Sequence, residues 1–261
     1  MKKSKIILFI SIILSVCFSS CEKVIDLELN TSSSQIVIQG NIYDQGGPYT
    51  VKISKSVNFD ESNDYPAVSG AMVVISDNAG NSDTLTEASS GIYTTSVLQG
   101  APGRTYTLKV ETDGQTYIAS STMPDAVEID SIYMEHSIFR NEEQVTIDFR
   151  DPANIDNYYR IIEFINNIQQ DQFYVISDKL YQGKEINYSI MSQYNDNKLE
   201  AGDEVTIWLE SVDKYVYEYF RTESSEGWQS ASPANPTSNI SNGALGYFNA
   251  CSVRTISIIV E

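Results

Sequence analysis

The feature that most constrains this chain is a series of short segments in which apolar and polar residues alternate, each closed by turn-forming residues. Tyr49, Val51 and Ile53 alternate with polar neighbours, and the segment 104–111 repeats the pattern. Period-two alternation is typical of antiparallel strands with one buried face. Gly, Pro, Asp and Asn separate the segments and favour tight turns. The alternation therefore predicts a mainly β fold.

The first part of the chain, residues 34–124, fits an immunoglobulin-like β-sandwich, because about seven short strands with turn signals fall within it. The predicted strands are 35–43, 49–56, 71–76, 83–86, 91–95, 104–111 and 116–122. The stretches 68–75, Gly80, 91–93 and 103–110 also resemble the transthyretin-like or carboxypeptidase-regulatory-like modules of secreted bacterial proteins. That resemblance implies a module without catalysis.

The second part, residues 125–261, is predicted to be another β-sandwich-like domain carrying one helix. Its predicted strands are 127–134, 144–150, 158–166, 173–177, 185–191, 204–210, 244–248 and 252–260. In 204–210, Val205, Ile207 and Leu209 form one face, so Trp208 on the other face needs a cover or a ligand.

A helix at 211–226 is the predicted cover for Trp208. Its apolar residues recur at helical spacing, at Val212, Tyr215, Val216, Tyr219 and Phe220. Ser211 is the expected N-cap, and Lys214 is expected to pair with Glu218 one turn later. The aromatic stripe is expected to be core, with a ligand shelf as the alternative.

Charge and histidine content exclude several functions. The chain has 35 acidic and 17 basic residues and a net charge of −18, which repels phosphate backbones and disfavours nucleic-acid binding. His136 is its single histidine, which disfavours Ser-His-Asp triads and most zinc sites. The sequence predicts no cofactor, no metal and no enzymatic activity.

Residues 1–20 read as a secretory signal peptide, with a basic start, an apolar run at 6–16 and small residues before Cys21. The end of this segment resembles a bacterial lipobox, which implies that Cys21 is acylated and becomes the new N-terminus. The alternatives are an ordinary signal peptide or a short membrane anchor, although the run falls short of the roughly 20 residues of a spanning helix. Acyl chains would anchor the protein through buried methylenes.

Residues 21–33 are then a tether. The acidic residues after Cys21 resemble a signal that sends Bacteroidota lipoproteins to the outer face of the outer membrane, with the periplasmic face as second choice. Cys251 would be the one free thiol of the mature chain, so no intramolecular disulfide can form. Its apolar surroundings predict a buried, inert cysteine.

Carboxylates offer the only candidate for hydrolysis. Glu142, Glu143, Asp148 and Asp151 could be read as a glycosidase pair, but chance pairs are expected in so acidic a chain, and a solvated face is the favoured interpretation. His136 is expected at the surface rather than as a general base. The acidic loops at 60–64 and 195–203 lack the EF-hand pattern, which leaves calcium binding a minor alternative.

Aromatic residues and two short motifs are the remaining candidates. Tyr158, Tyr159 and Trp228 are candidate partner contacts, because amphipathic rings contribute much contact area. Asp83-Thr84-Leu85 and Asp130-Ser131-Ile132 resemble a three-residue O-glycosylation motif, which would modify Thr84 and Ser131.

Segments along the whole mature chain are similar to one family, the Bacteroidota lipoproteins grouped as domain of unknown function 4249. The matching segments are 21–27, Asp151-Pro152-Ala153, Asn157-Tyr158-Tyr159-Arg160, Gly202-Asp203-Glu204-Val205, Tyr217-Glu218-Tyr219-Phe220, 235–240 and 243–248. The resemblance implies an outer-membrane lipoprotein that is often encoded beside a TonB-dependent receptor, and it transfers no catalytic residue.

The leading hypothesis is therefore a non-enzymatic, lipid-anchored accessory or ligand-handling partner of a TonB-dependent transporter. A surface adhesin or structural module is the alternative, and a carboxylate-dependent hydrolase is a distant third.

Overall fold

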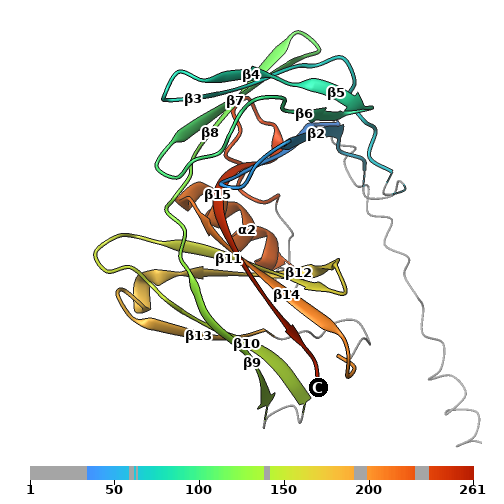
Figure 1. Ribbon diagram of the computed structural model, residues 1–261. Helices are drawn as coiled ribbons and strands as arrows, with labels where there is room; N and C mark the ends of the chain where they lie inside the picture. The colour runs from blue at the N-terminus through green and yellow to red at the C-terminus, as the bar shows by residue number, and fades with distance from the viewer. Residues whose placement is uncertain (1–33, 59–61, 63, 138–141, 191–198, 227–234) are drawn as a thin grey trace, which may run out of the picture. The chain divides into compact units, whose positions relative to one another are not determined.

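The computed structural model describes residues 34–58, 62, 64–137, 142–190, 199–226 and 235–261 (Figure 1). These residues belong to one compact unit that begins at Ser34. They form three β-sheets, one α-helix and one short 3-10 helix, Asp178–Leu180. The prediction of a mainly β, sandwich-like chain with one amphipathic helix is thus confirmed.

An eight-stranded sheet runs through the whole unit, in the order β12-β11-β14-β15-β1-β2-β6-β5. Its strands are β1 (Ile36–Tyr43), β2 (Thr50–Lys55), β5 (Thr86–Ser89), β6 (Ile92–Thr94), β11 (Tyr158–Ile165), β12 (Ile168–Ser177), β14 (Glu204–Val212) and β15 (Leu245–Ile259).

Two smaller sheets cover parts of the large one. The four-stranded sheet has the order β4-β3-β7-β8, and the three-stranded sheet has the order β13-β10-β9. Their strands are β3 (Met72–Asp77), β4 (Ser82–Thr84), β7 (Thr105–Thr112), β8 (Gln115–Thr122), β9 (Ile129–Ser137), β10 (Glu142–Arg150) and β13 (Glu185–Ile190).

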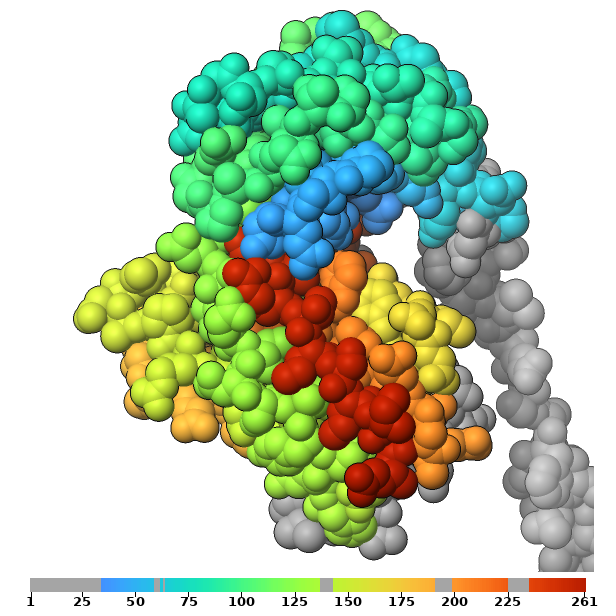
Figure 2. Space-filling view, viewed as in Figure 1, coloured from blue at the N-terminus to red at the C-terminus, as the bar shows by residue number. Residues whose placement is uncertain are grey.

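Strand β15 is the element that joins the two ends of the chain. Its first half pairs in parallel with β1, from Val37↔Leu245 to Tyr43↔Cys251, and its second half pairs antiparallel with β14. In Figure 2 its red surface lies beside the blue surface of β1. Two separate strands were predicted here, and that prediction is wrong: residues 249–251 break the apolar alternation but remain extended, since β1 supplies their pairing partners.

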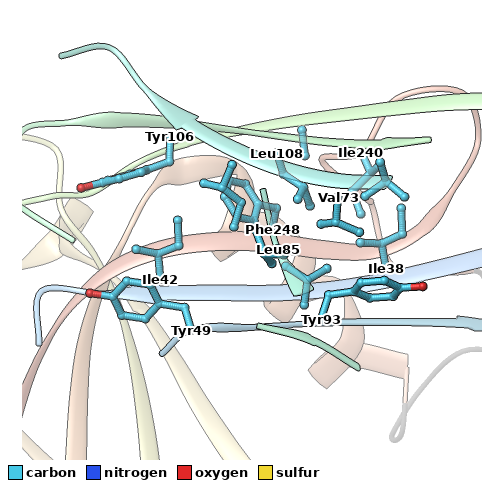
Figure 3. Packing of buried hydrophobic residues seen from close by; sticks show 14 of the residues in the cluster. Ile38, Ile42, Tyr49, Val73, Leu85, Tyr93, Tyr106, Leu108, Ile240 and Phe248 are labelled. Carbon is cyan, nitrogen blue, oxygen red and sulfur yellow. The ribbon is translucent and has the colours of Figure 1, made fainter. Parts of the chain in front are cut away.

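The first hydrophobic core lies between the four-stranded sheet and the β15-β1-β2-β6 part of the large sheet. Figure 3 shows Val73, Tyr106 and Leu108 facing Ile38 and Ile42 across this core. Ile240, Ala244, Phe248 and Ala250 also belong to it, although they lie far along the sequence. The predicted boundary between two domains at residue 124 stays a prediction. The first hydrophobic core contains residues from before and after this boundary.

The rest of the large sheet is covered on both faces. One face packs on the three-stranded sheet through a core that includes Phe149, Tyr159 and Leu209. The opposite face of these strands packs on helix α2 (Lys214–Glu226) through Val216, Phe220 and further apolar residues. Among the described residues no helix is long and apolar enough to cross a membrane.

Details around the helix and one strand differ from the sequence-based expectations. Ser211 is not the N-cap, because it is buried within β14; Asp213 caps the helix instead, accepting hydrogen bonds from the Tyr215 and Val216 N–H groups at 2.8 and 3.0 Å. Glu218 pairs with Arg221 rather than with Lys214.

The predicted strand 83–86 is also split. The structure has two short strands there, β4 and β5, which pair in different sheets.

Candidate functional site

A buried polar cluster lies on the face of the large sheet that α2 covers. Strand alternation explains its position, because Val205, Ile207 and Leu209 of β14 face the three-stranded sheet while Trp208 and Glu210 face the helix. We call Asn41, Arg160, Glu210, Asn249 and Cys251 the Glu210 cluster; they come from β1, β11, β14 and β15.

Helix α2 is fixed over this cluster at its N-terminus. The Asp213 carboxylate caps the helix with Oδ1 and accepts hydrogen bonds from Ser121 Oγ and the Thr122 N–H with Oδ2. Ser121 Oγ also accepts a hydrogen bond from the Ala250 N–H at 3.0 Å. One side chain therefore ties the start of the helix to β8 and, through Ser121, to β15.

The centre of the cluster is an ion pair that is shielded from water. Arg160 Nη1 lies 3.3 Å from Glu210 Oε2, and the two side chains are 10% and 0% exposed. The guanidinium carbon lies 3.8 Å from the centroid of the Phe220 ring and 5.0 Å from that of Phe173. These contacts are cation–π interactions, which gain strength when the cation is desolvated. The Phe220 ring of α2 therefore packs directly against the Arg160 guanidinium.

Burial dominates the protonation equilibria in the cluster. It raises the pKa of Glu210, and the neighbouring Arg160 guanidinium opposes that rise. It also raises the pKa of the Cys251 thiol, and the carboxylate of Glu210 adds to this effect. The Cys251 thiol is therefore protonated at neutral pH and is a poor nucleophile. This agrees with the expected buried cysteine.

Amide side chains complete the cluster with long contacts. Asn249 Nδ2 donates to Asn41 Oδ1 and to Cys251 Sγ, both at 3.3 Å. Asn41 Nδ2 donates to the Tyr247 hydroxyl oxygen at 3.4 Å. The two N–H···O distances exceed the usual 2.7–3.2 Å, whereas bonds to sulfur are normally longer than bonds to oxygen, so the contact with Cys251 is not stretched. The polar groups of the cluster are thus spread out rather than tightly bonded to one another.

A second feature is an exposed apolar surface on two joined loops. Ile155, Leu180 and Tyr181, which we call the apolar tip, are 58%, 76% and 38% exposed. The loops are joined because Gln182 Oε1 accepts from the Asn154 N–H at 3.0 Å and Gln182 Nε2 donates to the Ile155 carbonyl at 2.8 Å.

Two buried carboxylates support these loops from below. Asp151 accepts hydrogen bonds from the Tyr159 hydroxyl and the Gly183 N–H, at 2.6 and 3.0 Å. Asp178 accepts from the Asn157 N–H at 2.8 Å. Burial raises the pKa of Asp178, and the charge of Asp151 adds to that rise. The apolar tip is therefore displayed on a scaffold held by many hydrogen bonds.

A third feature is a polar surface cavity of about 360 Å³. Its one ammonium and its one carboxylate neutralise each other, since Lys55 Nζ lies 3.2 Å from Asp113 Oδ2. The cavity is lined by Ser34, Gln35, Ile36, Lys55, Asp113, Tyr117, Asn242 and Gly243.

The aromatic residues proposed as partner contacts fall in different environments. Tyr159 is fully buried and bonded to Asp151, so its side chain lies in the core rather than at the surface. Tyr158 is half-buried and stacks on Tyr217 of α2, with the ring centroids 4.9 Å apart. Trp228 lies outside the described residues, as does Cys21.

The two glycosylation-like motifs also differ in exposure. Thr84 is exposed at the end of edge strand β4. Ser131 is half-buried, and its hydroxyl donates to Asp148 Oδ2 at 2.8 Å.

Two of the carboxylates considered for hydrolysis, Glu143 and Asp148, have separate partners. Glu143 lies 2.9 Å from His136 Nδ1 at the exposed end of the β9–β10 pair, and Asp148 bonds Ser131 and Asn187. Among the described residues there is no group of three or more His, Cys, Asp or Glu side chains that could hold a metal. Residues 60, 61, 63 and 195–198 of the acidic loops lie outside this part of the chain.

The Glu210 cluster was not predicted from the sequence. A signal for it existed, because Glu210 shares a strand face with Trp208, and the amphipathic helix was expected to cover that face. A charged residue under a helix needs a buried partner. The identity of that partner, Arg160 on β11, depends on strand order and could not be read from spacing.

Among solved structures, this chain is similar to two segments made of fibronectin-type domains. A two-domain segment of chicken tenascin has 11% identity and a TM-score of 0.23, covering 70% of this chain and 93% of that one. The FN1–FN3 domains of chicken CNTN1 have 12% identity and a TM-score of 0.29, covering 88% of this chain and 68% of that one.

A search of curated proteins gave no match. The sequence model of one family, the domain of unknown function DUF4249, matches residues 22–257, which is nearly the whole chain. The chain therefore belongs to the DUF4249 family.

Proposed function

We propose that this protein is a non-enzymatic lipoprotein, anchored to the outer membrane through acylated Cys21, that works as an accessory or ligand-handling partner of a TonB-dependent transporter. The observation that carries the proposal is the position of the family match, which begins at residue 22, directly after Cys21. The family match then covers residues 22–257, which follow the proposed acylation site. The transporter partnership itself rests on the resemblance to Bacteroidota lipoproteins.

The apolar tip is the surface that we assign to the partner contact. Large apolar side chains that are exposed together often mark interaction sites. The scaffold of Gln182, Asp151 and Asp178 fixes the two loops, so little conformational entropy is lost when a partner binds. Leu180, the most exposed of the three tip residues, is expected to contribute most.

The test is affinity purification of the tagged, lipidated protein from its own outer membrane in gentle detergent. We expect a large β-barrel receptor in stoichiometric amount, and its loss when Ile155→Ser and Leu180→Ser are combined. Val97→Ser is the matched control, because Val97 is 71% exposed but belongs to the first part of the chain. Repeated recovery of the protein without a barrel would reject the partnership.

The anchor is tested separately. Metabolic labelling with a palmitate analogue should mark the wild-type protein and not a Cys21→Ala variant. Protease added to intact cells should digest a surface-exposed protein and spare one on the periplasmic face of the same membrane. Label on the Cys21→Ala variant would contradict acylation at this residue.

A surface adhesin is the second candidate, and the polar cavity favours it. The cavity volume of about 360 Å³ is within the range of small-molecule sites. Since Lys55 and Asp113 compensate each other, the lining suits a neutral ligand with many hydroxyl groups, such as a saccharide. Binding on a glycan array that is lost in an Asn242→Ala variant, without any barrel in the purification, would favour this function.

A further inference from the structure

The Glu210 cluster contains three polar atoms that have no protein hydrogen-bond partner. They are Arg160 Nε, Glu210 Oε1 and Asn249 Oδ1, and each belongs to a buried residue. A fourth such atom, Ser211 Oγ, belongs to the next residue of β14, whose side chain faces the other side of the sheet. Buried polar groups of native proteins nearly always have a partner, from the protein or from ordered water.

The groups around the cluster explain why these three atoms have no hydrogen-bond partner from the protein. Asn249 Nδ2 donates to Asn41 and Cys251, and Arg160 Nη1 donates to Glu210 Oε2. The Asn249 amide also lies close enough to lower the pKa of Glu210, but Glu210 Oε1 has no partner at hydrogen-bond geometry. The cover is aromatic, because Phe220 and Phe173 lie over the guanidinium. The Phe rings offer no ordinary acceptor for the Nε–H and no donor for the two oxygens, and the nearby Tyr43 and Tyr247 hydroxyls make no hydrogen bond to these three atoms.

The distances within the cluster point the same way. Its direct contacts between nitrogen and oxygen atoms are 3.3–3.4 Å long. By contrast, Asp213 caps α2 at 2.8 and 3.0 Å. Buried water in proteins typically bonds to buried polar groups that have no protein partner, and these three atoms are such groups.

We propose that the Glu210 cluster is an internal water-binding site beneath α2. The three unpartnered atoms are one donor and two acceptors, which is the set that a water molecule complements. Water accepts a hydrogen bond from the Arg160 Nε–H and donates hydrogen bonds to Glu210 Oε1 and Asn249 Oδ1. The bound water hydrates the buried Arg160–Glu210 pair, and it becomes part of the surface on which Phe220 of α2 rests.

The first experiment is a crystal structure of the mature protein at a resolution that reveals ordered water. The expected result is a density peak within hydrogen-bonding distance of at least two of the three atoms. If instead the three atoms bond to protein groups, or the space between them holds no peak, the proposal is wrong. This result does not depend on any variant folding.

The second experiment counts long-lived internal water by oxygen-17 magnetic relaxation dispersion. The double variant Arg160→Met/Glu210→Leu removes the charges and most of the bonding capacity, so it should lose about one long-lived water relative to the wild type. The control Lys55→Met/Asp113→Asn removes an ion pair whose side chains are 42% and 65% exposed, and it should lose none. Equal counts in the wild type and the first variant would overturn the proposal.

Discussion

Gly246 is predicted to be the residue whose substitution most directly tests the joining of β15 to β1. It has φ of +91°, and a Cβ atom built on it would lie 2.0 Å from the Ile38 carbonyl oxygen and 2.9 Å from the carbonyl carbon. Ile38 is its registered partner on β1. Because real Cβ atoms essentially never approach within 3.0 Å, the Gly246→Ala variant must move one strand away from the other by about 1 Å.

The magnitude follows from two contributions. A left-handed backbone costs an alanine about 1–2 kcal/mol, reduced by up to about 1 kcal/mol through the lower entropy of the unfolded chain. Moving β15 from β1 weakens roughly two backbone hydrogen bonds, at about 1 kcal/mol each, and disturbs the packing of Ile38 by about 1 kcal/mol more. We therefore expect the free energy of unfolding to fall by about 4 kcal/mol.

Gly243→Ala is the matched control. Gly243 has φ of +70°, but a Cβ atom there would meet nothing within 4 Å. The Gly243→Ala variant has the backbone strain of a left-handed alanine but no steric overlap, so its free energy of unfolding should fall by about 1 kcal/mol. The assay is guanidinium unfolding of the wild type and both variants, monitored by tryptophan fluorescence. The free energies of unfolding are compared from the denaturant midpoints, with one m-value used for all three proteins. Equal losses in the two variants would refute the argument that close approach to β1 requires glycine.

Three further predictions concern buried polar groups. Burial would raise the pKa of Asp83, but its hydrogen bonds from Ser96, Val97 and Leu98, at 2.7–3.0 Å, outweigh burial and hold that pKa below its usual value. The Asp83 carboxylate therefore stabilises the fold above about pH 4, and this contribution is lost as the pH falls through its folded-state pKa. The difference in the free energy of unfolding between the wild type and an Asp83→Asn variant, measured by urea unfolding, should narrow from pH 6 to pH 3. A difference that stays constant would contradict the lowered pKa of Asp83. Arg160→Met alone should lose about 3–5 kcal/mol because it leaves Glu210 buried without its partner, whereas Arg160→Met/Glu210→Leu should lose less in the same unfolding assay. A larger loss in the double variant than in the single variant would contradict this reasoning. Cys251 is 0% exposed, so a thiol reagent should label it in denatured protein and not in native protein, and rapid native labelling at this position would contradict its burial.

The sequence by itself determined the local elements of this protein. Alternation predicted most of the strands within a few residues, and the helical spacing of Val216, Tyr219 and Phe220 predicted the helix that covers Trp208. Two members of the predicted stripe differ from expectation, because Val212 lies in β14 and Tyr215 is 68% exposed rather than in the core. These elements depend on the side chains of neighbouring residues, which repeat every two residues in a strand and every 3.6 in a helix. The helical spacing did not fix the exact first residue of the helix, so Ser211 was predicted as the cap where the structure has Asp213.

Only the tertiary structure decided which distant segments meet. The parallel pairing of β1 with β15 brings together residues about 200 positions apart, and it places Phe248 in the first core and Asn249 beside Asn41. The order of β11 and β14 gives Glu210 its partner Arg160. Strand order and register depend on the packing of whole faces against one another, and no local period in the sequence records that packing. The buried cluster under α2 is therefore a property of the assembled sheet. Asn41, Arg160 and Glu210 fall in predicted strands, whereas Asn249 and Cys251 lie between the two predicted strands 244–248 and 252–260.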